Sequence, residues 1–309
     1  MHDDTITVAN KIISRDVLFE IFTEMQKKLD QCLRISSDEE LQNERIDYKY
    51  QKWTFRDSES KLNFDIDFYD GTSIKYDKYD DFIRVFDSRL REIKNIYAFL
   101  VLNYSTQEEE QQGKYHSQTI SLRISETKID TIISLDSSDA KMEDTYEFIR
   151  DKTSNAPEKY DEVIKKKGSI YAIVGLTIGL IPGIIISTLL LLVPAVRDIF
   201  VNGYVVYPFC VVALAFVVGG TIAASKLDKM YKNIIPGRKF VGYDSGGKSS
   251  VYKDDIDEYV ETSEVLIGKS ADNLKLRQSI METYGKHKKR LPAELIALVL
   301  FSVIILFFR

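Results

Sequence analysis

The chain has 309 residues, of which 29 % are charged and 44 % are hydrophobic, and its formal net charge is −5. This length allows one large domain or two smaller ones. The acidic balance argues against nucleic acid as the main partner, and the two cysteines, Cys32 and Cys210, do not indicate a disulfide framework.

Residues 1–153 are expected to form a cytoplasmic α+β domain. Apolar residues at helical spacing predict helices, and strict alternation of apolar and polar residues predicts strands. The order β-α-βββ-α-βββ-α, with strands joined by hairpins, is typical of a mainly antiparallel sheet with helices packed on it. The predicted helices are 15–33, 80–93 and 141–151, and the predicted strands are 5–13, 46–55, 62–68, a short strand near Ile74, 96–104, 117–124 and 128–135.

The acidic side chains Asp65, Asp67 and Asp70 are the strongest candidates for a metal site in this domain. A calcium loop needs ligands at positions 1, 3 and 5 and glycine at position 6. Here Tyr69 occupies position 5 and Gly71 position 7, so a solvated strand face is the preferred interpretation. We predict no catalytic residue, no metal site and no cofactor. The histidines are far apart in the sequence: His2, His116 and His287.

Residues 154–167 are expected to be a basic linker that leads into two membrane-spanning helices, 168–196 and 199–225. Neither of these two segments contains a charged side chain. Each is longer than the roughly 20 residues that a helix needs to cross a bilayer. Their many aliphatic residues favour insertion, and no charge opposes it.

Small residues recur every four positions in both apolar segments, as in a glycine zipper. They are Gly175, Gly179 and Gly183 in the first segment and Ala215, Gly219 and Ala223 in the second. This spacing places them on one helix face and allows close approach of a second helix. The two faces could pack against each other within one chain, or they could join subunits into a homo-oligomer. Pro182 is expected to kink the first helix and could act as a hinge.

Residues 226–290 are expected to form a cytoplasmic hairpin and amphipathic helices. Gly242, Gly247, Lys248 and Ser249 match the pattern of a phosphate-binding P-loop. However, no buried strand precedes the match and no apolar-faced helix follows it, so we predict a hairpin there and no NTPase. Two helices are then predicted, the first marked by Ile256, Tyr259, Val260, Leu266 and Ile267 and ended by Gly268, the second marked by Leu274, Ile280, Met281 and Tyr284.

Residues 291–308 are expected to form a third transmembrane helix, with an interfacial or re-entrant segment as the alternative. Basic residues cluster at one end of the apolar segments, where they set topology and face lipid headgroups: Lys165, Lys166, Lys167, Lys286, Lys288, Lys289 and Arg290. Because lysine and arginine concentrate on the cytoplasmic side, we predict a multi-pass protein of the cytoplasmic (plasma) membrane with its N-terminus in the cytoplasm.

Together these features predict a non-enzymatic integral membrane protein. Its cytoplasmic domain would bind an unidentified cytoplasmic protein or small molecule and control an associating helical region in the lipid bilayer. The layout resembles membrane effectors of bacterial defence and abortive-infection systems, in architecture and without a shared motif. The alternatives are a membrane-anchored scaffold or accessory subunit of a larger complex, and a membrane-tethered enzyme, which the missing catalytic groups disfavour.

Overall fold

The computed structural model describes residues 2–37, 53–55, 60–135, 142–191, 193, 206–234 and 262–307. The chain forms two compact units. The first consists of the described parts of Met1–Tyr160 and Tyr243–Asp272, and the second of those of Asp161–Gly242 and Asn273–Arg309. The first unit therefore includes a segment that lies more than a hundred residues beyond the predicted domain end at 153.

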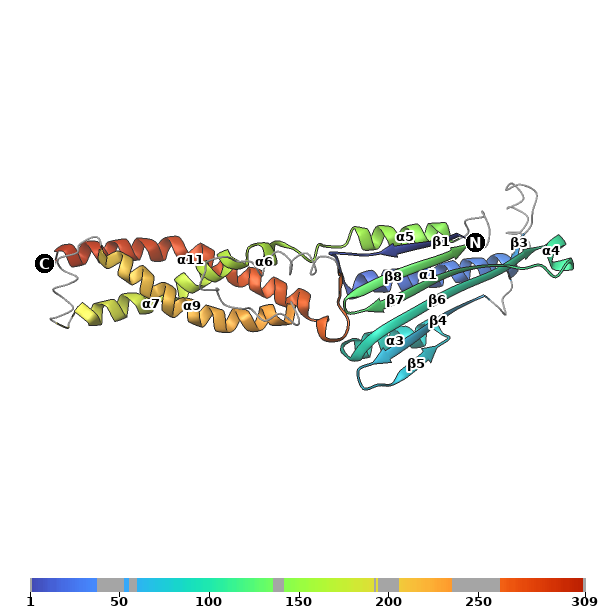
Figure 1. The fold of residues 1–309 in the computed structure, drawn as a ribbon, viewed down its shortest axis with the longest axis horizontal. Coiled ribbons are helices and arrows are strands. Elements are labelled where there is room, and N and C mark those ends of the chain that lie inside the picture. Colours follow the sequence, from blue (N-terminus) through green and yellow to red (C-terminus); the bar gives the residue numbers. More distant parts are fainter. Residues whose placement is uncertain are drawn as a thin grey trace, which may run out of the picture. The chain divides into compact units, whose positions relative to one another are not determined.

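The first unit contains a seven-stranded antiparallel sheet with helices packed on it, which confirms the predicted α+β class (Figure 1). The order across the sheet is β1-β8-β7-β6-β4-β5, and β3 also pairs with β6. The strands are β1 (His2–Thr7), β3 (Trp53–Phe55), β4 (Lys61–Phe68), β5 (Ser73–Tyr76), β6 (Ile93–Thr106), β7 (His116–Ser125) and β8 (Lys128–Leu135). The rest of the strand predicted over 46–55 lies outside the described residues.

Helices of the first unit bury their apolar faces against one face of this sheet. They are α1 (Arg15–Ser37), α3 (Tyr79–Arg89), which continues into the 3-10 turn η2 (Leu90–Glu92), and α5 (Glu143–Ser154). The short helix α4 (Gln107–Gln111), which the sequence did not predict, joins β6 to β7.

An aromatic cluster fixes α1 and α3 on the sheet. Phe64 of β4 lies opposite the small Ala98 of β6. The ring of Phe82 stacks on Phe64 with centroids 3.7 Å apart, and Phe22 meets Phe82 edge-on at 5.0 Å. All three rings are fully buried, and each burial contributes about 1.5–3 kcal/mol.

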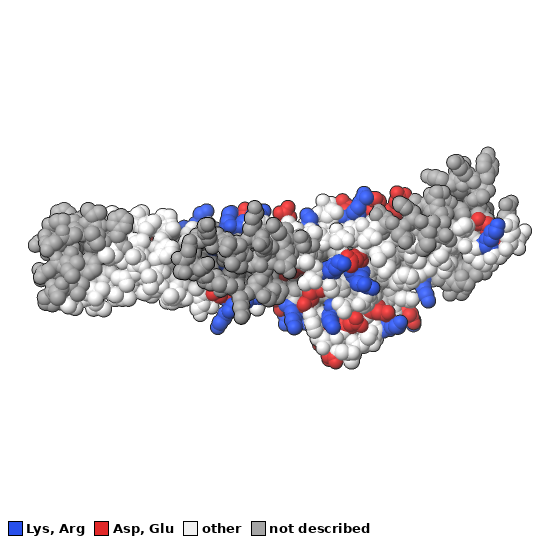
Figure 2. All heavy atoms as spheres, in the orientation of Figure 1, with Lys and Arg blue, Asp and Glu red and all other residues white. Residues whose placement is uncertain are grey.

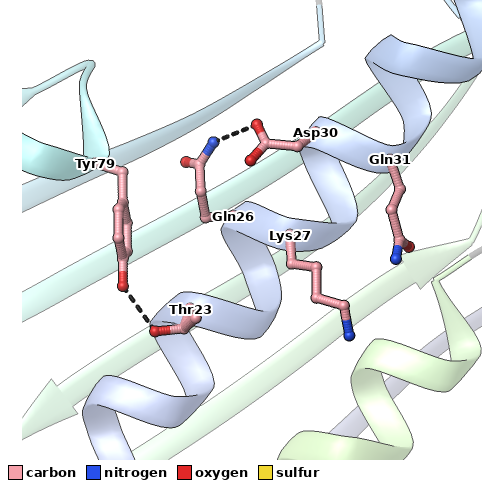
Figure 3. Close-up of a pocket in the computed structure, with 6 residues that line it drawn as sticks. All are labelled: Thr23, Gln26, Lys27, Asp30, Gln31 and Tyr79. Atoms are coloured by element: carbon pink, nitrogen blue, oxygen red, sulfur yellow. Dashed lines mark hydrogen bonds between the residues drawn. The ribbon is translucent and has the colours of Figure 1, made fainter.

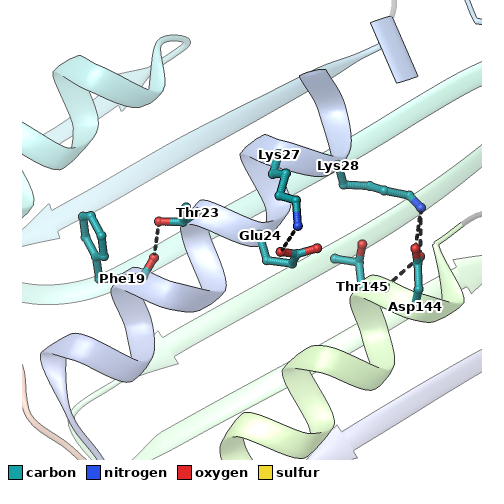
Figure 4. Close-up of polar contacts among 7 residues, drawn as sticks. All are labelled: Phe19, Thr23, Glu24, Lys27, Lys28, Asp144 and Thr145. Atoms are coloured by element: carbon teal, nitrogen blue, oxygen red, sulfur yellow. Dashed lines mark hydrogen bonds and ion pairs between the residues drawn. The ribbon is translucent and has the colours of Figure 1, made fainter. Parts of the chain in front are cut away.

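Charged contacts hold α5 beside α1 (Figure 4). The Lys28 ammonium group of α1 lies 2.8 Å and 2.9 Å from the two carboxylate oxygens of Asp144 at the start of α5. Asp144 also accepts a hydrogen bond from the backbone of Thr145. An acidic residue in the first turn is favourable because the helix N-terminus carries partial positive charge.

A separate parallel pair of strands corrects two predictions. The strand predicted over 5–13 is interrupted at Asn10, whose φ is +53°, and resumes as β2 (Ile12–Ile13). Strand β2 pairs with β9 (Glu264–Val265). Leu266 and Ile267 were predicted to belong to a helix, and this prediction is wrong. They follow strand β9 and are buried in the first unit. A short apolar run can fill either role, and here backbone pairing with β2 decides it.

The second unit is helical, with α6 (Glu162–Lys165), α7 (Lys167–Leu191), α9 (Val206–Ile234) and α11 (Asn273–Phe307). Helix α7 continues through Pro182. Helix α11 is one continuous element that joins the second predicted amphipathic helix to the predicted third span, with Pro292 inside it. The predicted hairpin with the P-loop match, and the residues from Ile256 to Val260, lie outside the described part of the chain.

Candidate functional site

Helices α7 and α9 approach each other through backbone atoms. A Cβ atom added to Gly179 would lie 1.9 Å from the carbonyl oxygen of Ala215. One added to Gly219 would lie 1.6 Å from the carbonyl oxygen of Gly175. No side chain fits at either glycine. Small residues repeated every four positions allow two helices to approach this closely.

The remaining small residues of the two rows belong to the same interface or are buried. A Cβ on Gly183 would meet the backbone of Ala215 and Val211 at 3.1 Å, and Ala223 is 1 % exposed. In contrast, a Cβ on Gly220 would meet nothing within 4 Å. The structure thus brings the two predicted rows together within one chain.

Away from its charged end, the helical unit exposes many apolar side chains. Two helices in the described part of the chain, Lys167–Leu190 and Cys210–Ile234, are long and apolar enough to cross a membrane. Only 39 % and 28 % of their most apolar windows are buried, whereas the core helix of a soluble protein is mostly buried. The exposed residues include Ile181, Ile185, Leu189, Phe216, Val217, Ile222, Ile296, Val299, Leu300 and Ile304.

Charged groups gather at one end of the helical unit (Figure 2), and tyrosines contact some of them. The Tyr171 hydroxyl group donates a hydrogen bond to Asp228 at 2.6 Å and so joins α7 to α9. The Tyr231 hydroxyl group donates to the carbonyl oxygen of Val163 at 3.0 Å. The ammonium group of Lys167 lies 5.0 Å from the Tyr231 ring centre, within the range of a cation–π contact.

An ion pair between a buried arginine and a partly exposed aspartate joins α6 to α11 at the same end. Arg277, only 3 % exposed, lies 2.8 Å from the carboxylate of Asp161. Asp161 also caps α6 by accepting hydrogen bonds from the backbone of Val163 and Ile164. Without Asp161 the buried charge of Arg277 would be left uncompensated, so this pair constrains how α6 and α11 meet.

The predicted headgroup-facing lysines flank these contacts. Lys165 ends α6, Lys166 forms an ion pair with Glu162 at 2.7 Å, and Lys167 begins α7. The other cluster lies within α11, before its apolar half: Lys286, Lys288, Lys289 and Arg290. Burial, followed by the charges of Arg290 and Lys226, lowers the pKa of His287 within this cluster.

The first unit has an open hollow of about 270 Å³ beside α1, bordered by residues with polar side chains (Figure 3). Across it, the hydroxyl groups of Thr23 and Tyr79 are 2.8 Å apart, and Gln26 donates to Asp30 at 2.7 Å. Burial is the main cause that raises the pKa of Tyr79. The hydroxyl, amide and carboxylate groups at the hollow are thus bonded to one another in pairs. The lining residues are Thr23, Gln26, Lys27, Asp30, Gln31 and Tyr79.

The acidic strand residues make local contacts. Asp65 lies 3.6 Å from the ammonium group of Lys75, and Asp67 accepts a hydrogen bond from Asn95 at 3.2 Å. Asp70 accepts from the backbone and the hydroxyl group of Thr72, and these bonds lower its pKa. Among the residues that the structure describes, no group of three or more His, Cys, Asp and Glu side chains could hold a metal ion.

Comparisons with protein-family models, with curated proteins and with solved structures found no match for this chain. Any functional assignment therefore rests on the structure of this chain alone.

The segment that follows the P-loop match is structurally important, and sequence reasoning missed its role. Residues 263–268 are buried one after another in the first unit. The carboxylate of Glu126 accepts a hydrogen bond from the backbone N–H of Lys269. Burial, together with a hydrogen bond to the same carboxylate, raises the pKa of Tyr69. The run Val-Leu-Ile between Glu264 and Gly268 is a signal of a buried strand that could have found it.

Proposed function

We propose that this protein is a non-enzymatic, multi-pass protein of the cytoplasmic membrane, with α7, α9 and the second half of α11 in the bilayer. The supporting observation is the apolar surface that these helices expose, bounded at one end by basic residues and tyrosines. Tyrosine and lysine are favoured at the interface between lipid and water. By the positive-inside rule that end is cytoplasmic, together with the first unit.

Cysteine labelling tests this topology. Val193 follows α7 and is 45 % exposed, and Lys114 lies in the exposed β6–β7 connection of the first unit. In a background with Cys32→Ala and Cys210→Ala, Val193→Cys should react with a membrane-impermeant maleimide on intact cells. Lys114→Cys should react only after permeabilisation. Labelling of both on intact cells, or recovery of the chain without detergent, would contradict the proposal.

The first unit would act as the sensing domain, with the hollow lined by Thr23 and Tyr79 as its ligand site, and would control the helices. In the effector form of this proposal, expression of the chain should slow growth and admit a dye. Purified protein should also release dye from vesicles of phosphatidylethanolamine and phosphatidylglycerol. Sealed vesicles and normal growth under all conditions would exclude the effector form.

The second candidate is a membrane-anchored scaffold or accessory subunit. It is favoured by the packing of the glycine row against α9 of the same chain, which leaves that face without a free surface for a second subunit. A monomer by mass in detergent, together with harmless expression, would select the scaffold.

A further inference from the structure

Two segments of the first unit lead directly into the helices of the second. The outgoing connector, residues 157–160, is followed by Asp161, the N-cap of α6. The returning connector, residues 262–272, is followed by Asn273, the first residue of α11. Both connectors bond to the same short stretch, residues 10–13, which we term the clamp segment.

The outgoing connector forms an antiparallel bridge with one edge of the clamp segment. The Ile12 N–H donates to the carbonyl oxygen of Pro157 at 2.7 Å, and the Lys159 N–H donates to the carbonyl oxygen of Asn10 at 2.9 Å. The next amide, that of Tyr160, donates to the side-chain oxygen of Asn10 at 2.9 Å. Three hydrogen bonds thus fix the last residues before α6.

The returning connector forms a parallel ladder with the other edge. The Glu264 N–H donates to the carbonyl oxygen of Lys11 at 2.8 Å, and the Leu266 N–H donates to that of Ile13 at 2.9 Å. Ser263 of this connector also donates its hydroxyl hydrogen to the carbonyl oxygen of Val8, two residues before the clamp segment, at 2.5 Å. This connector is therefore built into the fold of the first unit.

Asn10 and Lys159 link both connectors at once. Asn10 accepts from the outgoing connector and donates its own N–H to the carbonyl oxygen of Thr262 at 3.1 Å. Its left-handed backbone suits asparagine better than most residues. The ammonium group of Lys159, a residue 3 % exposed, donates to the hydroxyl group of Thr262 at 2.8 Å.

We propose that the clamp segment couples the two connectors, so that a movement of the first unit shifts the start of α6 and the start of α11 together. Helix α1, which lines the hollow, begins at Arg15, two residues after the clamp segment. A ligand that moves α1 would thereby act on the first residues of both helices. This regulatory role rests on the proposed function, whereas the coupling itself is a property of the first unit.

Amide hydrogen exchange on the full chain in detergent micelles tests the coupling. Ser263→Ala removes a bond that involves only the returning connector and Val8. The control is Ser60→Ala, at another buried serine of the first unit: it removes the bond that Ser60 donates to the carbonyl oxygen of Asn103 and the bond that it accepts from the Asn103 N–H. If the connectors are coupled, Ser263→Ala should speed exchange about fivefold, the factor for one ordinary hydrogen bond, at Leu266 and also at Lys159. The control should change neither amide. Faster exchange at Leu266 alone would overturn the proposal.

A disulfide gives the converse test if Ser263→Ala fails to fold. Lys11 and Glu158 are directly opposite in the antiparallel bridge, and the bonds on either side make them a non-hydrogen-bonded pair. Their Cα atoms should be about 4.5 Å apart, within disulfide range. In the Cys32→Ala, Cys210→Ala background, oxidised Lys11→Cys/Glu158→Cys should slow exchange in the returning connector at Glu264 and Leu266. Protection confined to residues 157–160 would refute coupling. Neither measurement needs a membrane. A negative result for the coupling would therefore not contradict the proposed membrane topology, and a negative result for the topology would not contradict the coupling.

Discussion

Gly219→Ala and Gly220→Ala place the same methyl group on neighbouring residues of α9 in opposite surroundings. At Gly219 the new Cβ would lie 1.6 Å from the carbonyl oxygen of Gly175 and 2.6 Å from the backbone nitrogen of Gly179. Backbone atoms cannot rotate away as the end of a side chain can, so α7 and α9 must move apart. At Gly220 the methyl group would meet nothing within 4 Å.

The expected magnitudes follow from these surroundings. Overpacking costs about 1–3 kcal/mol and occasionally more, while alanine gains up to about 1 kcal/mol over glycine in a helix. Gly219→Ala should therefore lower the free energy of unfolding of the helical unit by about 1–3 kcal/mol. Gly220→Ala should leave it unchanged or raise it by up to about 1 kcal/mol.

The measurement is unfolding of the full chain in mixed micelles with increasing SDS, followed by circular dichroism. Because the contact lies within one chain, the difference between the two variants should not depend on protein concentration. Equal stability of the two variants would refute the close α7–α9 contact. A difference that shrinks on dilution would show instead that the glycine face joins subunits, because diluted subunits separate and lose the contact in both variants.

Other positions give independent tests. Gly268→Ala should destabilise the first unit more than Gly113→Ala in thermal unfolding. Both glycines have a positive φ, but only at Gly268 would a Cβ collide, because it would lie 2.6 Å from the carbonyl oxygen of Ile93. Equal losses of stability in the two variants would refute the collision. Arg277→Met should cost the helical unit about 1–3 kcal/mol in the SDS titration, because it removes the hydrogen-bonding partner of the Asp161 carboxylate, which is 28 % exposed. Unchanged stability would show that water replaces the arginine. The pKa of His287 is lowered, so the folded state favours the neutral imidazole ring. The contribution of His287 to the stability of the helical unit should therefore be complete above about pH 6.5, the ordinary pKa of histidine. It should be lost as the pH falls below that value. His287→Gln should weaken this dependence, and an unchanged pH profile would assign it to other groups.

The local pattern of the chain was sufficient to predict most elements of the first unit. Phe64 and Ile66 alternate with polar residues on β4, and Phe82 and Phe86 recur at helical spacing on α3, because each element must bury one face. The same reasoning identified the small residues of α7 and α9. These signals are local, so they are present in the sequence itself.

Only the tertiary structure decided which surfaces meet. The spacing of Gly179 and Gly219 allows contact within a chain or between chains, and the fold places them together in one. Leu266 and Ile267 suit a helix or a strand, and pairing of the preceding residues with β2 decided the outcome. Asn10 carries no periodic signal, yet its backbone and side chain bond to segments about 150 and 250 residues away. Such long-range hydrogen bonds depend on the assembled fold, because no property of the residues near Asn10 specifies their distant partners.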